Sequence, residues 1–160
     1  MVLKKYRNKH LLFSMNLIKQ WFSTPLRKVG FEDIKYAIEN PLKHVLINTM
    51  DPTEQECLIK NTIPIIREET LMNEFIDNYE SKTIIIIVYG KNATDDSVET
   101  KYRQLLNLGF SEVYIYSGGM FEWLLLQDIY NVTEFPTTSI VRDLLKYRPM
   151  KLLNIPPRHY

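Results

Sequence analysis

The stretch from Ile84 to Trp123 constrains the fold of this chain more than any other part of the sequence. It opens with an apolar, β-branched run, Ile84–Val88, whose length fits one strand buried on both faces of a sheet. A polar loop over 90–96 follows, and then a helical pattern that stops at Gly109. Val113–Tyr116 predicts a second strand. Strand, loop, helix and strand form a βαβ unit, which predicts a parallel α/β sheet.

The loop over 90–96 is the first candidate for a functional site. In parallel α/β folds, ligands and reactive groups gather at the carboxyl ends of the strands. The helix expected after the loop has one apolar face, formed by Val98, Tyr102, Leu105 and Leu106. After the second strand, Ser-Gly-Gly at 117–119 turns into another helix, which carries Trp123 as a core residue.

Patterns outside this stretch predict further elements. A helix with Phe31, Ile34 and Ile38 on one face ends at Asn40-Pro41, and residues 45–50 predict a strand. A helix from about 69 to 79 has four apolar residues that we expect to face inward, Leu71, Phe75, Ile76 and Tyr79.

Residues 131–160 predict a last helix and a basic, extended tail. Thr137 or Thr138 would cap this helix, whose apolar residues are Ile140, Val141, Leu144 and Leu145. Three prolines from Pro149 onward predict the extended tail. The length of 160 residues fits one domain with an additional segment at each end. These parts are an arm over 1–30, a domain over 31–130 and this C-terminal region.

Basic residues gather at the two ends of the chain, although the net charge is only +1. Residues 29–141 hold eighteen of the nineteen acids beside eight basic residues, and residues 142–160 carry five bases against Asp143 alone. The first 28 residues contain no acid and seven cations, Lys4, Lys5, Arg7, Lys9, Lys19, Arg27 and Lys28. This distribution predicts a basic arm that binds a protein partner with an acidic surface, within a larger assembly.

The arm also predicts an amphipathic helix that ends before Pro25. Its apolar stripe follows a period of 3.6 residues at Leu11, Met15, Ile18 and Phe22. We expect this helix to pack on its own domain or on a neighbour. A membrane-surface anchor and a mitochondrial presequence also fit a basic, amphipathic segment with Trp21 at the edge of its stripe. No apolar run in the chain reaches the ~18 residues of a membrane span, so none is expected.

Four motifs within 84–123 occur at characteristic spacings. They are Val88-Tyr89, Leu108-Gly109-Phe110, Val113-Tyr114 and Gly118-Gly119 with Trp123 four residues later. Together they closely resemble the rhodanese (sulfurtransferase) family, whose fold the Cdc25-type phosphatases share. The resemblance extends in weaker form over about residues 31–128. It implies a three-layer α/β sandwich with a central, mainly parallel sheet and helices on both faces.

In that family the strand ends in Tyr-Cys, and the cysteine thiolate is the nucleophile. This sequence has Gly90 at the cysteine position, and the family's acidic and basic pair after the preceding strand is replaced by Asn48 and Met50. The resemblance therefore implies a domain without sulfurtransferase or phosphatase activity and without catalytic residues. Its degenerate active-site loop is Gly90, Lys91, Asn92, Ala93, Thr94, Asp95 and Asp96.

Two carboxylates in this loop oppose the binding of an anionic substrate. Asp96 stands three residues before Glu99, which predicts a capping box at the start of the helix. Asn92, Asp95 and Asp96 lack the regular spacing of a calcium site, so we expect no metal and no cofactor.

Cys57 is the only thiol, and we expect it to be a small buried apolar residue. A single cysteine excludes an internal disulfide and suits a reducing, cytoplasmic compartment. Residues 121–130 resemble rhodanese-like open reading frames of large DNA viruses, which implies the virion as another location.

Three functions follow from the sequence. The leading hypothesis is a non-catalytic structural or protein-interaction component. One alternative is a sulfurtransferase that uses Cys57 or a partner's thiol. A second is a nucleic-acid-associated protein that binds through its basic ends, although no recognition motif supports it.

Overall fold

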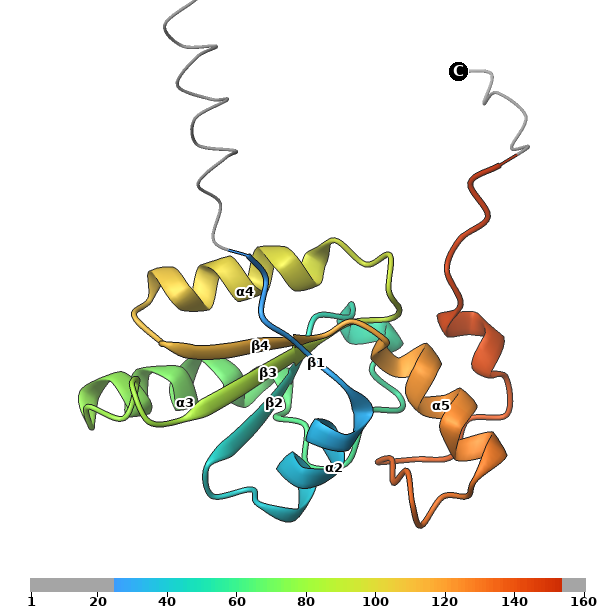
Figure 1. Ribbon diagram of the computed structural model, residues 1–160, viewed down its shortest axis with the longest axis horizontal. Coiled ribbons are helices and arrows are strands. Elements are labelled where there is room, and N and C mark those ends of the chain that lie inside the picture. Colours follow the sequence, from blue (N-terminus) through green and yellow to red (C-terminus); the bar gives the residue numbers. More distant parts are fainter. Residues whose placement is uncertain (1–24, 154–160) are drawn as a thin grey trace, which may run out of the picture.

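Four parallel strands form one sheet in the computed structural model, which describes residues 25–153 (Figure 1). The order across the sheet is β1-β4-β3-β2. The strands are β1 (Lys28–Val29), β2 (His44–Asn48), β3 (Ile85–Tyr89) and β4 (Glu112–Tyr116). The amphipathic segment 11–22, the five cations from Lys4 to Lys19 and the tail from 154 onward lie outside the described residues.

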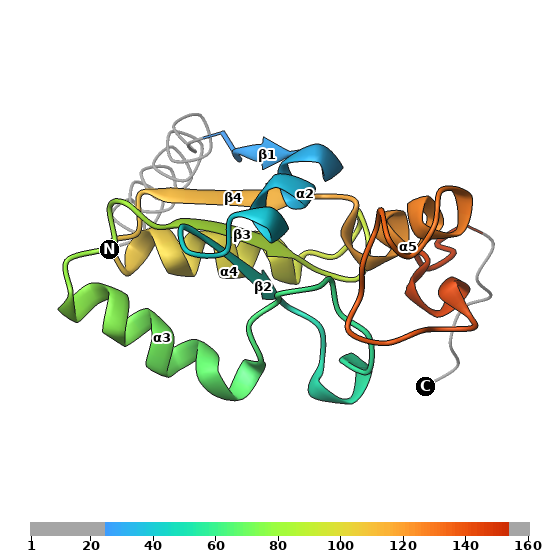
Figure 2. The same cartoon turned by 90° about the horizontal axis from the view of Figure 1, so that it is seen from below.

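Helices cover both faces of the sheet. They are α2 (Phe31–Glu39), α3 (Ile65–Asp77), α4 (Ser97–Asn107) and α5 (Gly119–Ile129), with short 3-10 helices η1 (Pro52–Glu54) and η2 (Leu144–Tyr147). Figure 2 shows α3 and α4 together on one side of the sheet and α2 on the other. The α/β three-layer architecture predicted from the sequence is confirmed. No helix within residues 25–153 is long and apolar enough to cross a membrane.

Strand β3 lies between two layers of apolar core. Ile86 and Val88 pack with residues of α3 and α4, whereas Ile87 and Tyr89 pack with residues of α2 and α5. All four side chains are at most 2% exposed. A parallel strand needs apolar residues on both faces when helices cover both, so the predicted doubly buried strand is confirmed.

The helices beside this strand follow their sequence patterns. Helix α4 buries Val98, Tyr102 and Leu105, and Gly109 follows its end with φ +99°, a conformation that favours glycine. Helix α5 buries Trp123 completely. Helix α2 ends at Glu39 with Asn40 as its C-cap residue, as predicted.

The prediction for α3 was only partly correct. The helix begins at Ile65, directly after Pro64, and ends at Asp77. Its buried face runs through Met72, with Leu71 and Phe75 partly buried. Ile76 is 36% exposed because it lies on the flank of that face, and Tyr79 is 90% exposed because it follows the end of the helix.

The predicted helix after Thr137 was wrong. Thr137 instead forms an antiparallel bridge with Ile59, and Thr138 N donates a hydrogen bond to Leu58 O at 2.8 Å. The threonines therefore pair with a distant segment and cap no helix. The only helix of residues 131–153 is η2, and the Asp143 side chain caps it by accepting from Leu145 N at 3.0 Å.

Strand β1 was not predicted, because two residues leave no readable pattern. It pairs in parallel with Ile115 and Tyr116 of β4. Arg27, directly before β1, donates to Ser111 O at 2.8 Å and to Glu112 Oε2 at 2.9 Å. The hydrogen bond from Arg27 lowers the pKa of Glu112. Arg27 thus holds the chain against β4.

Candidate functional site

The loop over 90–96 connects the carboxyl end of β3 to α4, as predicted. The start of α5 lies directly against it. Met120 N donates to Gly90 O, and Phe121 N donates to Lys91 O, both at 3.0 Å. Gly119 has φ +61°, and a Cβ there would lie 2.5 Å from Gly90 O. Only glycine permits this close approach of two backbones.

The carboxylate of Asp95 lies inside the loop. Its Oδ2 accepts from Lys91 N at 2.9 Å. Its Oδ1 accepts from Ser97 N at 3.1 Å and from Ser97 Oγ at 2.5 Å. The backbone amides of the loop and of the start of α4, which are suited to hold an anion, therefore bind an anionic side chain of the chain itself.

Gly90 is buried directly beside this carboxylate. A Cβ at Gly90 would lie 2.3 Å from Asp95 Oδ2 and 2.7 Å from Val98 Cγ2. Carbon atoms do not approach other atoms this closely, so any side chain at position 90 requires Asp95 and Val98 to move. The space that a residue larger than glycine would need is filled.

The predicted capping box of Asp96 and Glu99 is not formed. Asp96 is the N-cap residue of α4, but its side chain makes no capping hydrogen bond. Its backbone is already helical, with φ −68° and ψ −17°, whereas a capping side chain reaches the helix amides from an extended backbone. Asp95 caps the helix instead, through Ser97 N, and Glu99 pairs with Arg103 at 2.6 Å.

Lys91, the only cation of the loop, is paired. Its ammonium group contacts the carboxylate of Glu54 in η1, and both side chains are partly exposed. In the same segment, the side-chain hydroxyl of Thr53, together with its amide, holds the pKa of Asp51 below its usual range. The loop therefore presents no unpaired cation to an incoming anion.

Asn92 ties the loop to the C-terminal region. Its side chain is 8% exposed. The Oδ1 atom accepts from Thr94 N at 3.0 Å and from Thr94 Oγ1 at 2.8 Å, and Nδ2 donates to Tyr147 O at 2.8 Å. Ala93 and Thr94 form the exposed tip of the loop. Sequence reasoning missed the tie, because no local pattern links positions 92 and 147.

A cavity of about 520 Å³ lies between the loop and the C-terminal segment. Charged side chains of both signs line it, among them Glu54, Asp95, Lys146 and Arg148. Asn48 and Met50, which replace the charged pair of the resemblance, are both buried. Asn48 Oδ1 accepts from Met50 N at 3.2 Å, so this position supports the backbone of the segment after β2.

Cys57 lies in the core layer beside α2 and α5 and is 0% exposed. Its Sγ donates to Ser139 O at 3.2 Å. The expectation of a buried thiol is confirmed. Within residues 25–153 no three His, Cys, Asp or Glu side chains are grouped so that they could hold a metal ion.

Two cations of the predicted partner-binding arm, Arg27 and Lys28, lie within residues 25–153. Arg27 is engaged with Ser111 and Glu112, and its guanidinium carbon lies 4.1 Å from the centre of the Tyr114 ring. This residue therefore holds β1 in place, and its role in binding a partner stays a prediction. Lys28 is exposed.

The sequence matches the rhodanese-like domain family over residues 31–126. The comparison with curated proteins found no match. Three similar solved structures are the Alr3790 protein from Anabaena sp., a full-length protein from Lactobacillus plantarum, and Ygr203w, a yeast protein tyrosine phosphatase of the rhodanese family.

Their sequence identities to this chain are 21%, 18% and 13%, with TM-scores of 0.51, 0.53 and 0.56. The alignments cover 71%, 79% and 79% of this chain and 93%, 97% and 99% of those chains. At such identities the likeness shows the fold.

Proposed function

Because the chain belongs to the rhodanese-like domain family, we propose that it keeps the family's fold without its cysteine chemistry and serves as a structural or protein-interaction component. One observation carries the proposal. The carboxylate of Asp95 fills the space beside Gly90, where the resemblance places the family's nucleophile. The loop thus offers neither a thiol nor room for one.

The charge of the loop supports the same conclusion. A thiosulfate or phosphate ion would have to displace the Asp95 carboxylate from the amides of Lys91 and Ser97. If the carboxylate stayed nearby, two like charges about 4 Å apart would repel by about 4 kcal/mol at an effective dielectric constant of 20. A phosphatase of this fold would also need an arginine fork for phosphate, and residues 90–96 contain no arginine.

A sulfur-transfer assay tests this proposal directly. In a sulfurtransferase, the thiolate takes the outer sulfur of thiosulfate, releases sulfite and becomes a persulfide, and cyanide then removes that sulfur as thiocyanate. We expect the purified full chain to form no thiocyanate above the buffer rate and to release no nitrophenol from nitrophenyl phosphate. Turnover of either substrate by the chain would overturn the proposal.

The alternative that uses Cys57 needs this thiol to reach a substrate. Cys57 is fully buried, so we expect a thiol-reactive dye to label the chain only after unfolding in denaturant. Labelling of the native chain at the rate of the unfolded chain, together with thiocyanate formation that Cys57→Ala abolishes, would establish the alternative instead.

The basic arm supports the interaction part of the proposal. Residues 1–24 contain five cations and no acid. We expect a tagged chain purified from its native source to arrive in a larger assembly, with a virion as one setting, and to leave it as salt rises. Replacing Lys4, Lys5, Arg7 and Lys9 by glutamine should remove the chain from the assembly.

The matched control replaces four exposed cations of the domain that form no ion pair with any described residue: Lys43, Lys60, Arg67 and Lys82. This variant should be recovered in the assembly like the original chain. Full recovery of the arm variant would rule out the arm as the binding element. Loss of the assembly on nuclease treatment would favour the nucleic-acid alternative over a protein partner.

A further inference from the structure

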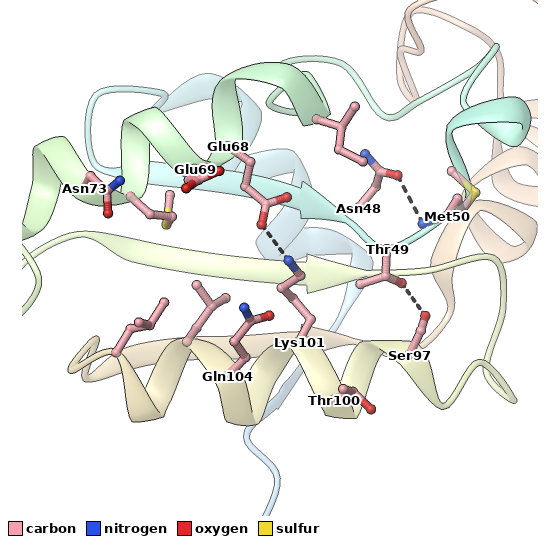
Figure 3. Close-up of a pocket in the computed structure, with 14 residues that line it drawn as sticks. Asn48, Thr49, Met50, Glu68, Glu69, Asn73, Ser97, Thr100, Lys101 and Gln104 are labelled. Carbon is pink, nitrogen blue, oxygen red and sulfur yellow. Dashed lines mark hydrogen bonds and ion pairs between the residues drawn. The ribbon is translucent and has the colours of Figure 1, made fainter.

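The groove between α3 and α4, of about 670 Å³, is crossed by contacts between its own polar side chains (Figure 3). Glu68 pairs with Lys101 at 2.7 Å, and Ser97 Oγ donates to Thr49 Oγ1 at 2.7 Å. The exposed apolar side chains gather elsewhere. Of the sixteen large ones among residues 25–153, nine belong to residues 125–153, which include α5 at one end of the molecule (Figure 1). This region is therefore the place to expect an apolar contact surface.

Helix α5 is apolar on two faces. The only polar residues among its eleven are Glu122, Gln127 and Asp128. Trp123 and Leu124 face the core and are at most 3% exposed. Leu125 and Ile129, one turn apart on the other face, are 38% and 70% exposed. A helix that is apolar all round is normally buried all round, so the outer face of α5 lacks its usual cover among residues 25–153.

The apolar surface continues beyond the end of α5. Val132 and Ile140 are 50% and 84% exposed, and both line a cavity of about 310 Å³ beside the helix. We call Leu125, Ile129, Val132 and Ile140 the α5 patch. Their exposed parts add up to roughly 500 Å², within the range of the largest apolar patch on a typical monomer, which is often functional. They also supply a large share of the roughly 800 Å² that each partner contributes to a standard interface.

Two charged side chains of opposite sign, Asp128 and Arg142, line the cavity of the α5 patch. Both are exposed, and neither forms an ion pair with any described residue. A strongly acidic or strongly basic partner would repel one of them, whereas a second copy of the same surface complements both. In a dimer with twofold symmetry each contact occurs twice, so Asp128 of either copy meets Arg142 of the other.

We propose that the α5 patch is the contact surface of a homodimer with twofold symmetry. Leu125 and Ile129 of the two copies pack against each other, and two Asp128–Arg142 pairs lie at the rim of the contact. The proposal rests neither on the loss of catalysis nor on the basic arm. Its consequence for the interaction function is that one dimer carries two arms, which bind a repetitive partner more tightly than a single arm does.

Sedimentation of the full chain at several concentrations tests the dimer. The modest apolar area predicts a Kd on the order of 10 µM. Between about 1 and about 100 µM the mass should therefore rise from the 19.0 kDa of one chain toward twice that value. A mass of one chain throughout would overturn the proposal. If only a chain ending at residue 153 dimerises, residues 154–160 cover the patch in the full chain, and the assignment to a second copy is wrong.

A pair of matched variants locates the contact. Ile129→Asp places an unpaired charge in the apolar contact and should raise the Kd of the dimer by about 100-fold. Ile66→Asp is the control, because Ile66 is 86% exposed on α3 and lies outside the patch, and it should leave the Kd unchanged. Both positions are exposed, so both variants should unfold in urea like the original chain. A dimer that survives Ile129→Asp, or equal effects of the two variants, would place the contact elsewhere.

Charge reversal tests the twofold pairing. Asp128→Arg or Arg142→Asp puts like charges together at both rim contacts, so each variant by itself should dimerise about tenfold more weakly. A mixture of the two variants restores opposite charges at both contacts. It should form mixed dimers with about the original Kd, which a fluorescent tag on one variant measures. A mixed dimer no tighter than the dimer of either variant alone would contradict the proposed pairing.

Discussion

Asp95 is the residue that organises the loop after β3. Its two carboxylate oxygens accept three hydrogen bonds from Lys91 and Ser97, and it holds the loop against the start of α4. The neighbouring Asp96 makes no capping hydrogen bond. Two adjacent and chemically identical side chains therefore have different effects on stability.

Asp95→Ala should lower the free energy of unfolding by about 0.5–2 kcal/mol, because the amides of Lys91 and Ser97 lose the carboxylate that caps the start of α4. Asp96→Ala should change it by no more than about 0.5 kcal/mol. Urea unfolding of both variants at the same pH and salt measures the difference. A larger loss for Asp96→Ala would show that the sequence-based capping box, and not the observed hydrogen bonding, stabilises the helix.

The sequence predicts where this loop lies in the chain but not the hydrogen bonds within it. The apolar run that ends at Tyr89 and the helical period that starts near Val98 bound the loop from both sides. Which aspartate caps α4 depends on the backbone angles of Asp96, and both aspartates satisfy the same pattern. The hydrogen bond from Asn92 Nδ2 to Tyr147 O joins positions 55 residues apart, so no local sequence pattern could predict it.

At the scale of elements, the ends of β3 and β4 carry two buried tyrosines with different surroundings. The Tyr89 hydroxyl lies 2.7 Å from Thr62 Oγ1 and accepts from Ile59 N at 3.2 Å. The Tyr116 hydroxyl is buried and makes no hydrogen bond of normal geometry with a described residue, although the Glu122 carboxylate lies near it and adds to the rise of its pKa. Burial raises the pKa of both phenols above the usual value.

Removing each hydroxyl should therefore have opposite results at pH 7. Tyr89→Phe leaves the Ile59 amide and the Thr62 hydroxyl without their partner and should cost about 1–3 kcal/mol. Tyr116→Phe removes a buried hydroxyl that makes no hydrogen bond of normal geometry, so stability should stay the same or rise. Thermal or urea unfolding compares the two. Equal losses would show that Tyr116 has a partner.

The same tyrosines predict how stability changes at high pH. In the unfolded chain a phenol loses its proton near pH 10, whereas the folded chain holds both protons to a higher pH. Above about pH 10 the unfolded state therefore binds fewer protons, and the free energy of unfolding falls as pH rises. The fall should be shallower for Tyr116→Phe. An unchanged slope in this variant would contradict the shifted pKa.

Most strands and helices of the domain could be predicted because the spacing of apolar residues along each element shows which of its faces is buried. Helices α2, α4 and α5 follow a helical apolar period, and β3 has apolar residues on both faces. The last predicted helix failed for a different reason. Thr137 and Thr138 are good capping residues, yet they bond to residues 58 and 59, about eighty positions away. Hydrogen bonds to this distant segment therefore outweigh the local preference of the two threonines for capping a helix.

At the scale of the molecule, the C-terminal region is part of the core. The family match ends at 126, but Phe135 and Tyr147 are 3% and 1% exposed. The Trp123 ring packs edge-on against Phe135, with ring centres 5.0 Å apart. Trp123 Nε1 donates to Pro136 O at 3.2 Å. The residues after α5 therefore complete the layer that contains Trp123.

A chain shortened to residues 1–130 should lose its cooperative unfolding transition. Loss of the Phe135 side chain alone is worth about 3–5 kcal/mol, a large share of the 5–15 kcal/mol that stabilises a typical domain. A chain ending at residue 153 serves as the control and should unfold like the full chain. Tryptophan fluorescence during denaturant unfolding, measured in chains that carry Trp21→Phe so that only Trp123 emits, reports on both. An unchanged transition in the shorter chain would mean that the family domain folds without this region.

The contact between Gly90 and Asp95 also determines which substitutions position 90 can accept. One nucleotide change converts a glycine codon to cysteine, but here the new side chain would collide with the carboxylate and with Val98. Gly90→Cys alone should therefore destabilise the loop, whereas the same substitution should cost less in a chain that already carries Asp95→Ala. The effect of a substitution at position 90 thus depends on the residue at position 95, and the two positions can change only as a coupled pair.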